Sequence, residues 1–188
     1  MMEFESDLIQ RFRDIVGLDG ILHQAEELVV YECDGYIVEK NVPDVVLFPK
    51  TTQDVVRIVR TCNEFDVPFV PRGAGTSLAG GCLPVGGGVM ISLTRMNQIV
   101  EVSLRDRYAV VQPGLVNLHL TNHLKGTGYH YAPDPSSQGA CTIGGNVATN
   151  SGGPHTLKYG VTVNHVLGLE VVMPDATVVE LGLSLIHI

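Results

Sequence analysis

Two glycine-rich segments hold most of the residues in this sequence that could do chemistry. Seven glycines lie between residues 73 and 88 and six lie between 139 and 160, so 13 of the 21 glycines fall in two segments. Glycine lets the backbone adopt positive φ angles and approach a ligand closely, and successive backbone N–H groups can then enclose an anion such as a phosphate. A pair of flexible turns would show the same clustering, and both interpretations stay open on glycine content alone.

The first segment completes neither of the common phosphate-binding motifs. Gly75 and Gly80 have the spacing of a Walker A loop, but residues 81–82 (Gly-Cys) stand where that loop needs lysine and a hydroxyl. Gly73 and Gly75 begin a dinucleotide fingerprint in which Leu78 replaces the third glycine. We therefore expect neither ATP or GTP hydrolysis nor a standard dinucleotide-binding crossover.

Composition excludes several classes of protein. The 188 residues include 12 Lys and Arg against 20 Asp and Glu, a formal net charge of −8, and 45% are hydrophobic. The acidic balance argues against nucleic acid or an anionic membrane surface as the main partner, and the apolar fraction argues against a disordered tail. The N-terminus is acidic where a secretory signal is basic, and no apolar run approaches the roughly 18 residues of a transmembrane segment. We expect a cytoplasmic protein whose four cysteines are small thiols outside disulfides.

Periodicity and turn signals predict the elements that must position the two segments. Short apolar runs predict strands at 45–48, 68–71, 89–93, 99–103, 108–112, 165–173 and 177–181. An apolar stripe predicts a helix over 6–16, Thr51 and Asp54 form a capping box for a helix that continues to 65, and further helical stretches are expected at 116–125 and after Thr142. Residues 18–42 receive no firm assignment. This order predicts an α+β fold with a small βαβ subdomain followed by a second, antiparallel-sheet subdomain.

The sequence also resembles a known family over about residues 20–182. PRGAGTSLAGG (71–81) resembles the pyrophosphate loop of FAD-linked oxidases of the vanillyl-alcohol oxidase type. YAPDPSSQGACTIGGNVATNSGGPHTLKYG (131–160), together with YECDG (31–35) and QPG (112–114), looks like the FAD-binding subunit of bacterial glycolate oxidase and its D-lactate dehydrogenase relatives. A long ungapped match of this kind is far more specific than a lone glycine motif.

The resemblance implies a set of FAD-binding residues in the two segments. In the first they are Pro71, Arg72, Gly73, Ala74, Gly75, Thr76, Ser77, Gly80 and Gly81. In the second they are Pro133, Asp134, Ser137, Thr142, Ile143, Gly144, Gly145, Asn146, Ser151, Gly152, Tyr159 and Gly160. Backbone amides would hold most of the pyrophosphate, so an acidic protein can still bind FAD. Some relatives attach FAD through a histidine where this sequence has Thr76, so we expect noncovalent FAD.

The family resemblance further implies an oxidoreductase in which FAD takes a hydride from C2 of a D-2-hydroxy acid. The electrons would leave through an iron–sulfur or other acceptor subunit. In that family a histidine base and a metal site come from a later substrate domain, so neither a catalytic residue nor a metal ligand is assigned in this chain. The alternatives are an FAD-binding module without turnover, a D-2-hydroxyglutarate dehydrogenase-like relative, and a truncation that does not fold stably.

The expected organisation is an N-terminal helical or irregular extension (1–42), an FAD-binding domain (43–182) and an atypical tail (183–188). LSLIHI, the tail, would be a short buried strand or the product of an interrupted sequence. The second interpretation predicts a fold that is incomplete at its C-terminus and a fragment that is not catalytically competent alone.

Several other polar residues have two interpretations each. His119 and His123 have helical i, i+4 spacing, but without a third ligand we expect an ordinary helix face. Asp134, between two prolines, could bind a cofactor N–H or start a turn. His155 is expected to serve a structural or hydrogen-bonding role, and Lys158 could offset cofactor charge or be solvated.

Overall fold

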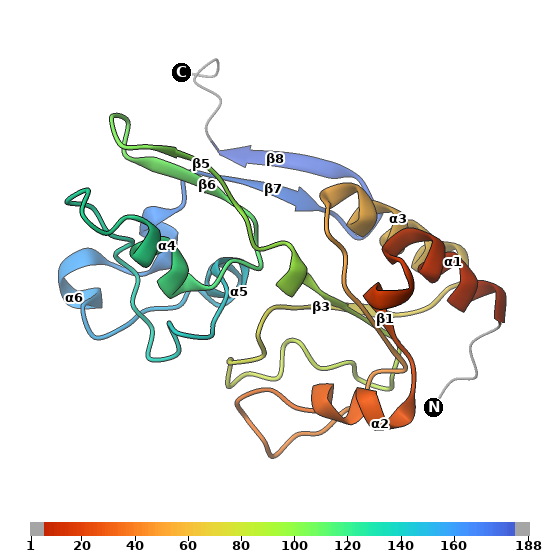
Figure 1. Ribbon diagram of the computed structural model, residues 1–188. Coiled ribbons are helices and arrows are strands. Elements are labelled where there is room, and N and C mark those ends of the chain that lie inside the picture. The colour runs from red at the N-terminus through yellow and green to blue at the C-terminus, as the bar shows by residue number, and fades with distance from the viewer. Residues whose placement is uncertain (1–5, 183–188) are drawn as a thin grey trace.

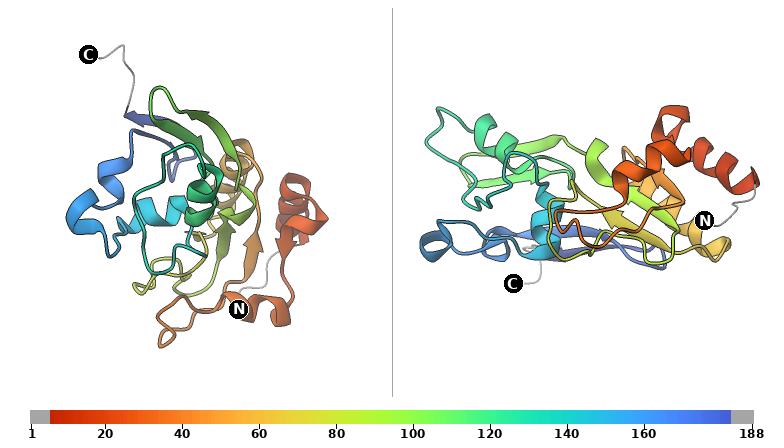
Figure 2. Two further views of the ribbon diagram at one scale, coloured as in Figure 1. Left: turned by 60° about the vertical axis from the view of Figure 1, so that its left-hand side comes forward. Right: turned by 90° about the horizontal axis from the view of Figure 1, so that it is seen from below.

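The computed structural model describes residues 6–182, so the sequence LSLIHI, for which two interpretations were open, lies outside the described residues. The molecule is elongated: a sheet with its covering helices lies at one end, and shorter helices and long loops lie at the other (Figure 1; Figure 2, right). The elements at the sheet end are α1 (Ser6–Val16), η1 (Leu18–Gly20), β1 (Ile21–Leu22), α2 (Ala25–Leu28), η2 (Val29–Tyr31), β2 (Val45–Leu47), α3 (Thr52–Glu64), β3 (Phe69–Arg72), β4 (Val89–Ser92) and η3 (Leu93–Arg95).

The remaining elements carry the second glycine-rich segment and two β-hairpins. They are β5 (Ile99–Ser103), β6 (Tyr108–Val111), α4 (Asn117–His123), α5 (Ile143–Thr149), α6 (Thr156–Tyr159), η4 (Thr162–His165), β7 (Gly168–Val172) and β8 (Val178–Gly182). The predicted strands agree with β2 to β8 to within a few residues at each end, and the predicted helix over 6–16 is α1.

The main sheet has the strand order β1-β2-β4-β3, in which β2, β4 and β3 are parallel and β1 is antiparallel to β2. Its central strands are buried on both faces, which explains their continuous apolar sequences. Side chains alternate between the faces: Val45 and Val89 join the core beneath α1 and α3, whereas Val46 and Met90 pack with Leu28 of α2. The sheet is therefore covered on one face by two long helices and on the other by the short α2.

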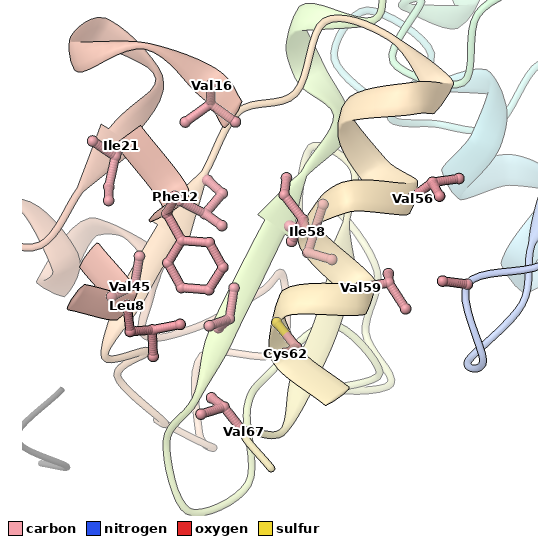
Figure 3. Packing of buried hydrophobic residues seen from close by; sticks show 14 residues of the cluster. Leu8, Phe12, Val16, Ile21, Val45, Val56, Ile58, Val59, Cys62 and Val67 are labelled. Atoms are coloured by element: carbon pink, nitrogen blue, oxygen red, sulfur yellow. The ribbon is translucent and has the colours of Figure 1, made fainter. Parts of the chain in front are cut away.

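Helix α3 begins where the sequence predicts. The Thr51 hydroxyl accepts a hydrogen bond from the backbone N–H of Asp54, and the Asp54 carboxylate accepts one from the backbone N–H of Thr51. The apolar side of α3 contributes Ile58 and Cys62 to the same core cluster as the fully buried Phe12 from α1 (Figure 3). The capping box and the apolar stripe thus set both the start of this helix and the face it buries.

The antiparallel strands form two hairpins, β5–β6 and β7–β8. In the described part of the chain the two hairpins share no strand pairing, so they are separate ribbons rather than one sheet. β5–β6 packs on a small cluster around Leu115, Leu120 and Leu124, and the tip of β7–β8 reaches the main core through Ala176. The α+β prediction is confirmed, with its antiparallel part divided into two ribbons.

The region left unassigned by the sequence contains β1, η1, α2 and η2. β1 pairs with β2 through Ile21↔Leu47 and Leu22↔Val46, so part of the predicted extension (1–42) completes the sheet of the predicted domain (43–182). That division remains a prediction. No helix within residues 6–182 has the length and apolar character needed to cross a membrane.

Candidate functional site

The first glycine-rich segment leaves the sheet at the end of β3. Arg72 is the last residue of that strand, and Gly75 follows with a positive φ of 69°. The segment returns to the sheet at Gly88, whose N–H donates to the buried carboxylate of Asp44 at 2.8 Å. Both ends of this long loop are therefore held by the sheet, and the loop emerges at the carboxyl end of a parallel strand.

Residues 31–35 (YECDG) lie directly against this loop. The Asp34 carboxylate accepts a hydrogen bond from the Gly80 N–H at 2.8 Å, and the Cys33 carbonyl accepts one from Arg72 Nη2 at 3.0 Å. A Cβ on Gly35 would lie 2.8 Å from the carbonyl oxygen of Ser77, so the two chain segments approach as closely as backbone allows. This segment is a support for the loop that the sequence predictions did not assign.

The second glycine-rich segment begins α5. Thr142 is the N-cap of this helix, and its hydroxyl accepts a hydrogen bond from the Gly145 N–H at 3.2 Å. The Gly144 N–H donates to the carbonyl of Pro113 at 2.8 Å, and a Cβ on Gly144 would lie 2.7 Å from Cβ of Pro113. The QPG sequence (112–114) thus forms the surface on which the start of α5 rests.

The two glycine-rich segments meet at Gly73. A Cβ added to Gly73 would lie 2.4 Å from the Thr142 hydroxyl oxygen and 3.8 Å from Cα of Gly145. Helix α5 accordingly sits in the middle of the molecule, between the sheet end and the end that carries α4 and α6 (Figure 1; Figure 2, right). Segments separated by about 70 residues in sequence therefore form one site, and only glycine fits at their contact.

Two buried asparagines beside this contact have unused hydrogen-bonding groups. Asn146 in α5 is 1% exposed, and within residues 6–182 neither its side-chain oxygen nor its side-chain nitrogen has a partner. Asn117 donates from Nδ2 to the Pro133 carbonyl at 3.0 Å, and its side-chain oxygen has no partner in the same range. Buried polar groups are nearly always satisfied, so these atoms indicate a polar ligand at this place.

The distal part of the second segment is joined to Asp134. His155 Nδ1 and the Asp134 carboxylate are hydrogen-bonded, which holds the pKa of that carboxyl below its usual range. A Cβ on Gly153 would lie 2.1 Å from the Asp134 carbonyl oxygen. Tyr159 packs edge-on against His130 at 5.9 Å between ring centres. Asp134 and His155 thus connect the beginning and the end of the segment 131–160. The hydrogen bond of His155 is of the kind expected for it.

Lys158 and the tyrosine of YAPDP differ in their surroundings. The Lys158 ammonium lies 4.8 Å from the ring centre of Tyr159 on the exposed α6. Tyr131 is half-buried, and burial raises the pKa of its phenol to about 12, so it stays protonated at neutral pH. His119 and His123 are exposed on α4. Among residues 6–182, no group of three or more His, Cys, Asp or Glu is placed to hold a metal ion.

The structure brings only part of the predicted FAD-binding set to the contact at Gly73. Gly73, Thr142 and Gly145 touch there. The neighbouring predicted residues are, in the first segment, Pro71, Arg72, Ala74, Gly75, Thr76 and Ser77, and in the second segment, Ile143, Gly144 and Asn146. The rest lie farther along their loops: Gly80, Gly81, Pro133, Asp134, Ser137, Ser151, Gly152, Tyr159 and Gly160. Within the described residues, no hydrogen bond or ion pair joins 151–160 to the first loop. The binding roles of all these residues remain predictions.

Sequence reasoning missed four supporting residues: Cys33, Asp34, Pro113 and Asn117. For Cys33, Asp34 and Pro113 a signal was present, because YECDG and QPG belong to the family resemblance, but nothing local indicates that these sequences contact the loops. Asn117 lies outside both motifs and had no such signal. Arg72, one of the residues predicted to bind FAD, is 8% exposed and donates to Cys33 and Cys82.

A family model described as "FAD binding domain" matches residues 43–182. The glycolate oxidase subunit GlcD of Escherichia coli (strain K12) is 45% identical over 168 residues, which is 89% of this chain and 34% of the relative. D-lactate dehydrogenase of Anaerostipes hadrus is 40% identical over 94% of this chain and 37% of the relative. D-2-hydroxyglutarate dehydrogenase of Stutzerimonas stutzeri is 36% identical over 95% of this chain and 39% of the relative. The chain spans about a third of the length of these curated relatives.

Solved structures show the same fold. An alkyldihydroxyacetonephosphate synthase matches with a TM-score of 0.84 at 24% identity, covering 97% of this chain and 38% of that one. A p-cresol methylhydroxylase matches with a TM-score of 0.79 at 24% identity, covering 93% of this chain and 34% of that one. At this identity the likeness supports the fold alone. The family match confirms the prediction of an FAD-binding domain, and the solved structures confirm its fold.

Proposed function

The chain belongs to the FAD binding domain family, and on that premise we propose that it is the flavin-binding part of an FAD-dependent D-2-hydroxy-acid oxidoreductase. The relatives named glycolate oxidase subunit, D-lactate dehydrogenase and D-2-hydroxyglutarate dehydrogenase support this substrate class. Bound FAD supplies the hydride acceptor. The residues of this chain bind and orient the cofactor, and none of them is assigned to the 2-hydroxy acid.

The contact between the two glycine-rich segments carries the proposal. Gly73, Thr142 and Gly145 join the carboxyl end of a parallel strand to the start of a helix, where the backbones of the two segments come close together. The N–H groups of residues 143–146 already donate within the protein, so within residues 6–182 the first loop supplies the free backbone amides. Such amides bind phosphate oxygens without requiring a cationic surface, in keeping with the formal net charge of −8. The unpartnered side chain of Asn146 supplies a donor and an acceptor for the same ligand.

The predicted FAD-binding residues fall into two groups that hold different parts of FAD. The first loop (71–81) and the start of α5 (142–146) hold the pyrophosphate and its neighbouring hydroxyls. Residues 133–137 and 151–160 of the second segment hold the parts of FAD that lie farther from the phosphates. Thr76 stands where some family members have the histidine that attaches FAD, and a threonine hydroxyl does not form that bond, so FAD is held noncovalently.

The proposal also includes an electron-accepting partner and a location in the cell. The relative from Escherichia coli is named a subunit, which supports a partner protein that accepts the electrons, of the iron–sulfur or another class. The four cysteines are free thiols in the structure, which agrees with a reducing compartment, so we place the protein in the cytoplasm.

The test is to purify the chain with FAD and record the visible flavin spectrum. We expect a bound flavin that acid precipitation releases into the supernatant. Yellow colour that remains in the precipitate would contradict noncovalent binding, and a colourless, folded protein would contradict the FAD site. Adding glycolate or D-lactate without oxygen should leave the spectrum unchanged. Bleaching by either acid would contradict the expectation that this chain is not catalytically competent alone.

A further inference from the structure

Arg72 is a buried cation whose described contacts include no carboxylate. Its guanidinium donates from Nη2 to the Cys33 carbonyl at 3.0 Å and from Nη1 to Cys82 Sγ at 3.3 Å, and it lies 5.7 Å from the ring centre of Tyr31. The residue is 8% exposed, and it forms no ion pair within residues 6–182. Burying a charge without an ion-pair partner is unfavourable.

The guanidinium lies against the backbone of the first glycine-rich loop. A Cβ added to Gly75 would lie 2.1 Å from Arg72 Nη2, and Gly75 has the positive φ that carries the loop over this group. Its charge therefore sits within a few ångströms of the loop amides, while its hydrogen bonds are directed to Cys33 and Cys82. Arg72 supports the loop and brings a positive charge beneath it.

The buried carboxylate of Asp34 lies near Arg72 and is hydrogen-bonded to backbone N–H groups. Asp34 is 5% exposed, and its carboxylate accepts hydrogen bonds from the N–H groups of Gly80 and Tyr36. Burial raises the pKa of the Cys82 thiol, Arg72 lowers it and Asp34 raises it, so both charges lie near the same thiol. Arg72 thus offsets the buried carboxylate of Asp34, which would otherwise repel an anion at the loop.

We propose that Arg72 is a positioning residue whose charge, beneath the loop, stabilises the bound FAD pyrophosphate, and that residues 31–35 hold its guanidinium in place. This inference rests on the proposed function. It assigns a role to YECDG, which precedes the residues matched by the family model. The backbone amides contact the phosphates, and the guanidinium supplies the positive charge that favours an anion at this loop.

The test uses three variants and two ligands. Arg72→Met removes the charge, and Arg72→Lys keeps it. Asp34→Asn removes the opposing charge and keeps an acceptor for the Gly80 N–H, but it loses the acceptor for the Tyr36 N–H. The control is Arg105→Met, because Arg105 is exposed on the β5–β6 hairpin. The dissociation constant for FAD is measured by flavin fluorescence at low and high salt, and binding of inorganic pyrophosphate is measured by thermal shift.

We expect Arg72→Met to weaken FAD roughly tenfold at low salt, as for a charge a few ångströms from the phosphates, with a smaller loss at high salt. Arg72→Lys should keep most of the affinity, Asp34→Asn should tighten binding, and Arg105→Met should change nothing. Pyrophosphate should show the same order. If Arg72→Met does not fold, the other two variants still test the inference, because Arg72→Lys should keep most of the FAD affinity and Asp34→Asn should raise it.

Unchanged FAD affinity in folded Arg72→Met would overturn the inference and leave the proposed function intact. Equal losses in Arg72→Lys and Arg72→Met, matched by equal losses of thermal stability, would overturn it by making Arg72 purely structural. An Asp34→Asn variant that binds FAD no better than wild type would contradict the charge argument. Wild-type protein that binds neither FAD nor pyrophosphate would overturn both this inference and the proposed function.

Discussion

The two glycine-rich segments form one site but use glycine in different ways. In the first segment five of seven glycines have positive φ, whereas in the second only one of six does. The first segment is held in place by residues outside its glycines, including Asp34, Asp44 and Arg72. Glycines of the second mostly allow close contacts, such as Gly144 on Pro113 and Gly153 on Asp134. Clusters of glycine that look alike in sequence therefore serve backbone conformation in one loop and close packing in the other.

The largest effect is expected at Gly73, where the two loops touch. Gly73→Ala would bring a methyl group to 2.4 Å from the Thr142 hydroxyl oxygen. Relieving this overlap requires the loops to separate, so we expect a loss of about 1–3 kcal/mol in the free energy of unfolding and loss of FAD binding. Chemical denaturation and flavin titration measure the two quantities. Normal FAD affinity in this variant would show that the two loops do not act as one site.

A second prediction concerns the buried asparagines. Asn146→Leu removes polar atoms that make no hydrogen bond in the described protein, so the unfolding free energy without FAD should change by less than about 1 kcal/mol. FAD affinity should nevertheless fall by roughly tenfold, since a hydrogen bond to the ligand is lost. Denaturation without FAD and flavin titration check both parts.

The matched control is Asn117→Leu. This change removes the hydrogen bond to the Pro133 carbonyl, so it should destabilise the protein by about 1–3 kcal/mol even without FAD. Equal destabilisation by Asn146→Leu and Asn117→Leu would mean that Asn146 serves the fold and not a ligand.

A smaller effect is expected where a glycine is not required. Gly81 in the first loop and Gly139 in the second have neither positive φ nor any atom within 4 Å of an added Cβ. Gly81→Ala and Gly139→Ala should therefore stabilise the protein by about 0.4–1 kcal/mol, because alanine reduces the entropy of the unfolded chain. Thermal unfolding measures this gain. Destabilisation by either change would indicate a backbone requirement that the contacts do not show.

The smallest effect is expected in the outer part of the second loop and depends on pH. The hydrogen bond from His155 lowers the pKa of Asp134 from its ordinary value of 3.8. Because the folded pKa is below the unfolded one, ionised Asp134 stabilises the fold above its ordinary pKa. This stabilisation is lost as the pH falls through the lowered pKa. Asp134→Asn should flatten the acid side of a plot of thermal stability against pH.

Asp175→Asn provides the comparison for that experiment. Thr177 lowers the pKa of Asp175 in the turn between β7 and β8, away from both glycine-rich loops. Both variants should lose some acid-side dependence of stability, but only Asp134→Asn should also change FAD affinity. Identical FAD titrations for the two variants would remove Asp134 from the binding site.

Local signals explain how much of the fold could be predicted. The Thr51–Asp54 capping box and the apolar stripe that follows define α3 within a few residues, so its start was predicted correctly. Residues 18–42 resisted assignment because β1 has only two residues and is formed by pairing with β2, which lies 24 residues farther along the chain. The antiparallel strands were predicted individually, but their division into two ribbons depends on long-range packing.

By itself, the sequence determined the glycine clusters, the strand and helix periods and the family resemblance, because each of these depends on residue type and spacing alone. Only the tertiary structure decided that Gly73 touches Thr142, that Arg72 turns beneath its loop toward Cys33, and that Asn146 is buried without a partner. These contacts join residues far apart in the chain. Their geometry follows from how the sheet, α5 and residues 31–35 pack together, which no local pattern encodes.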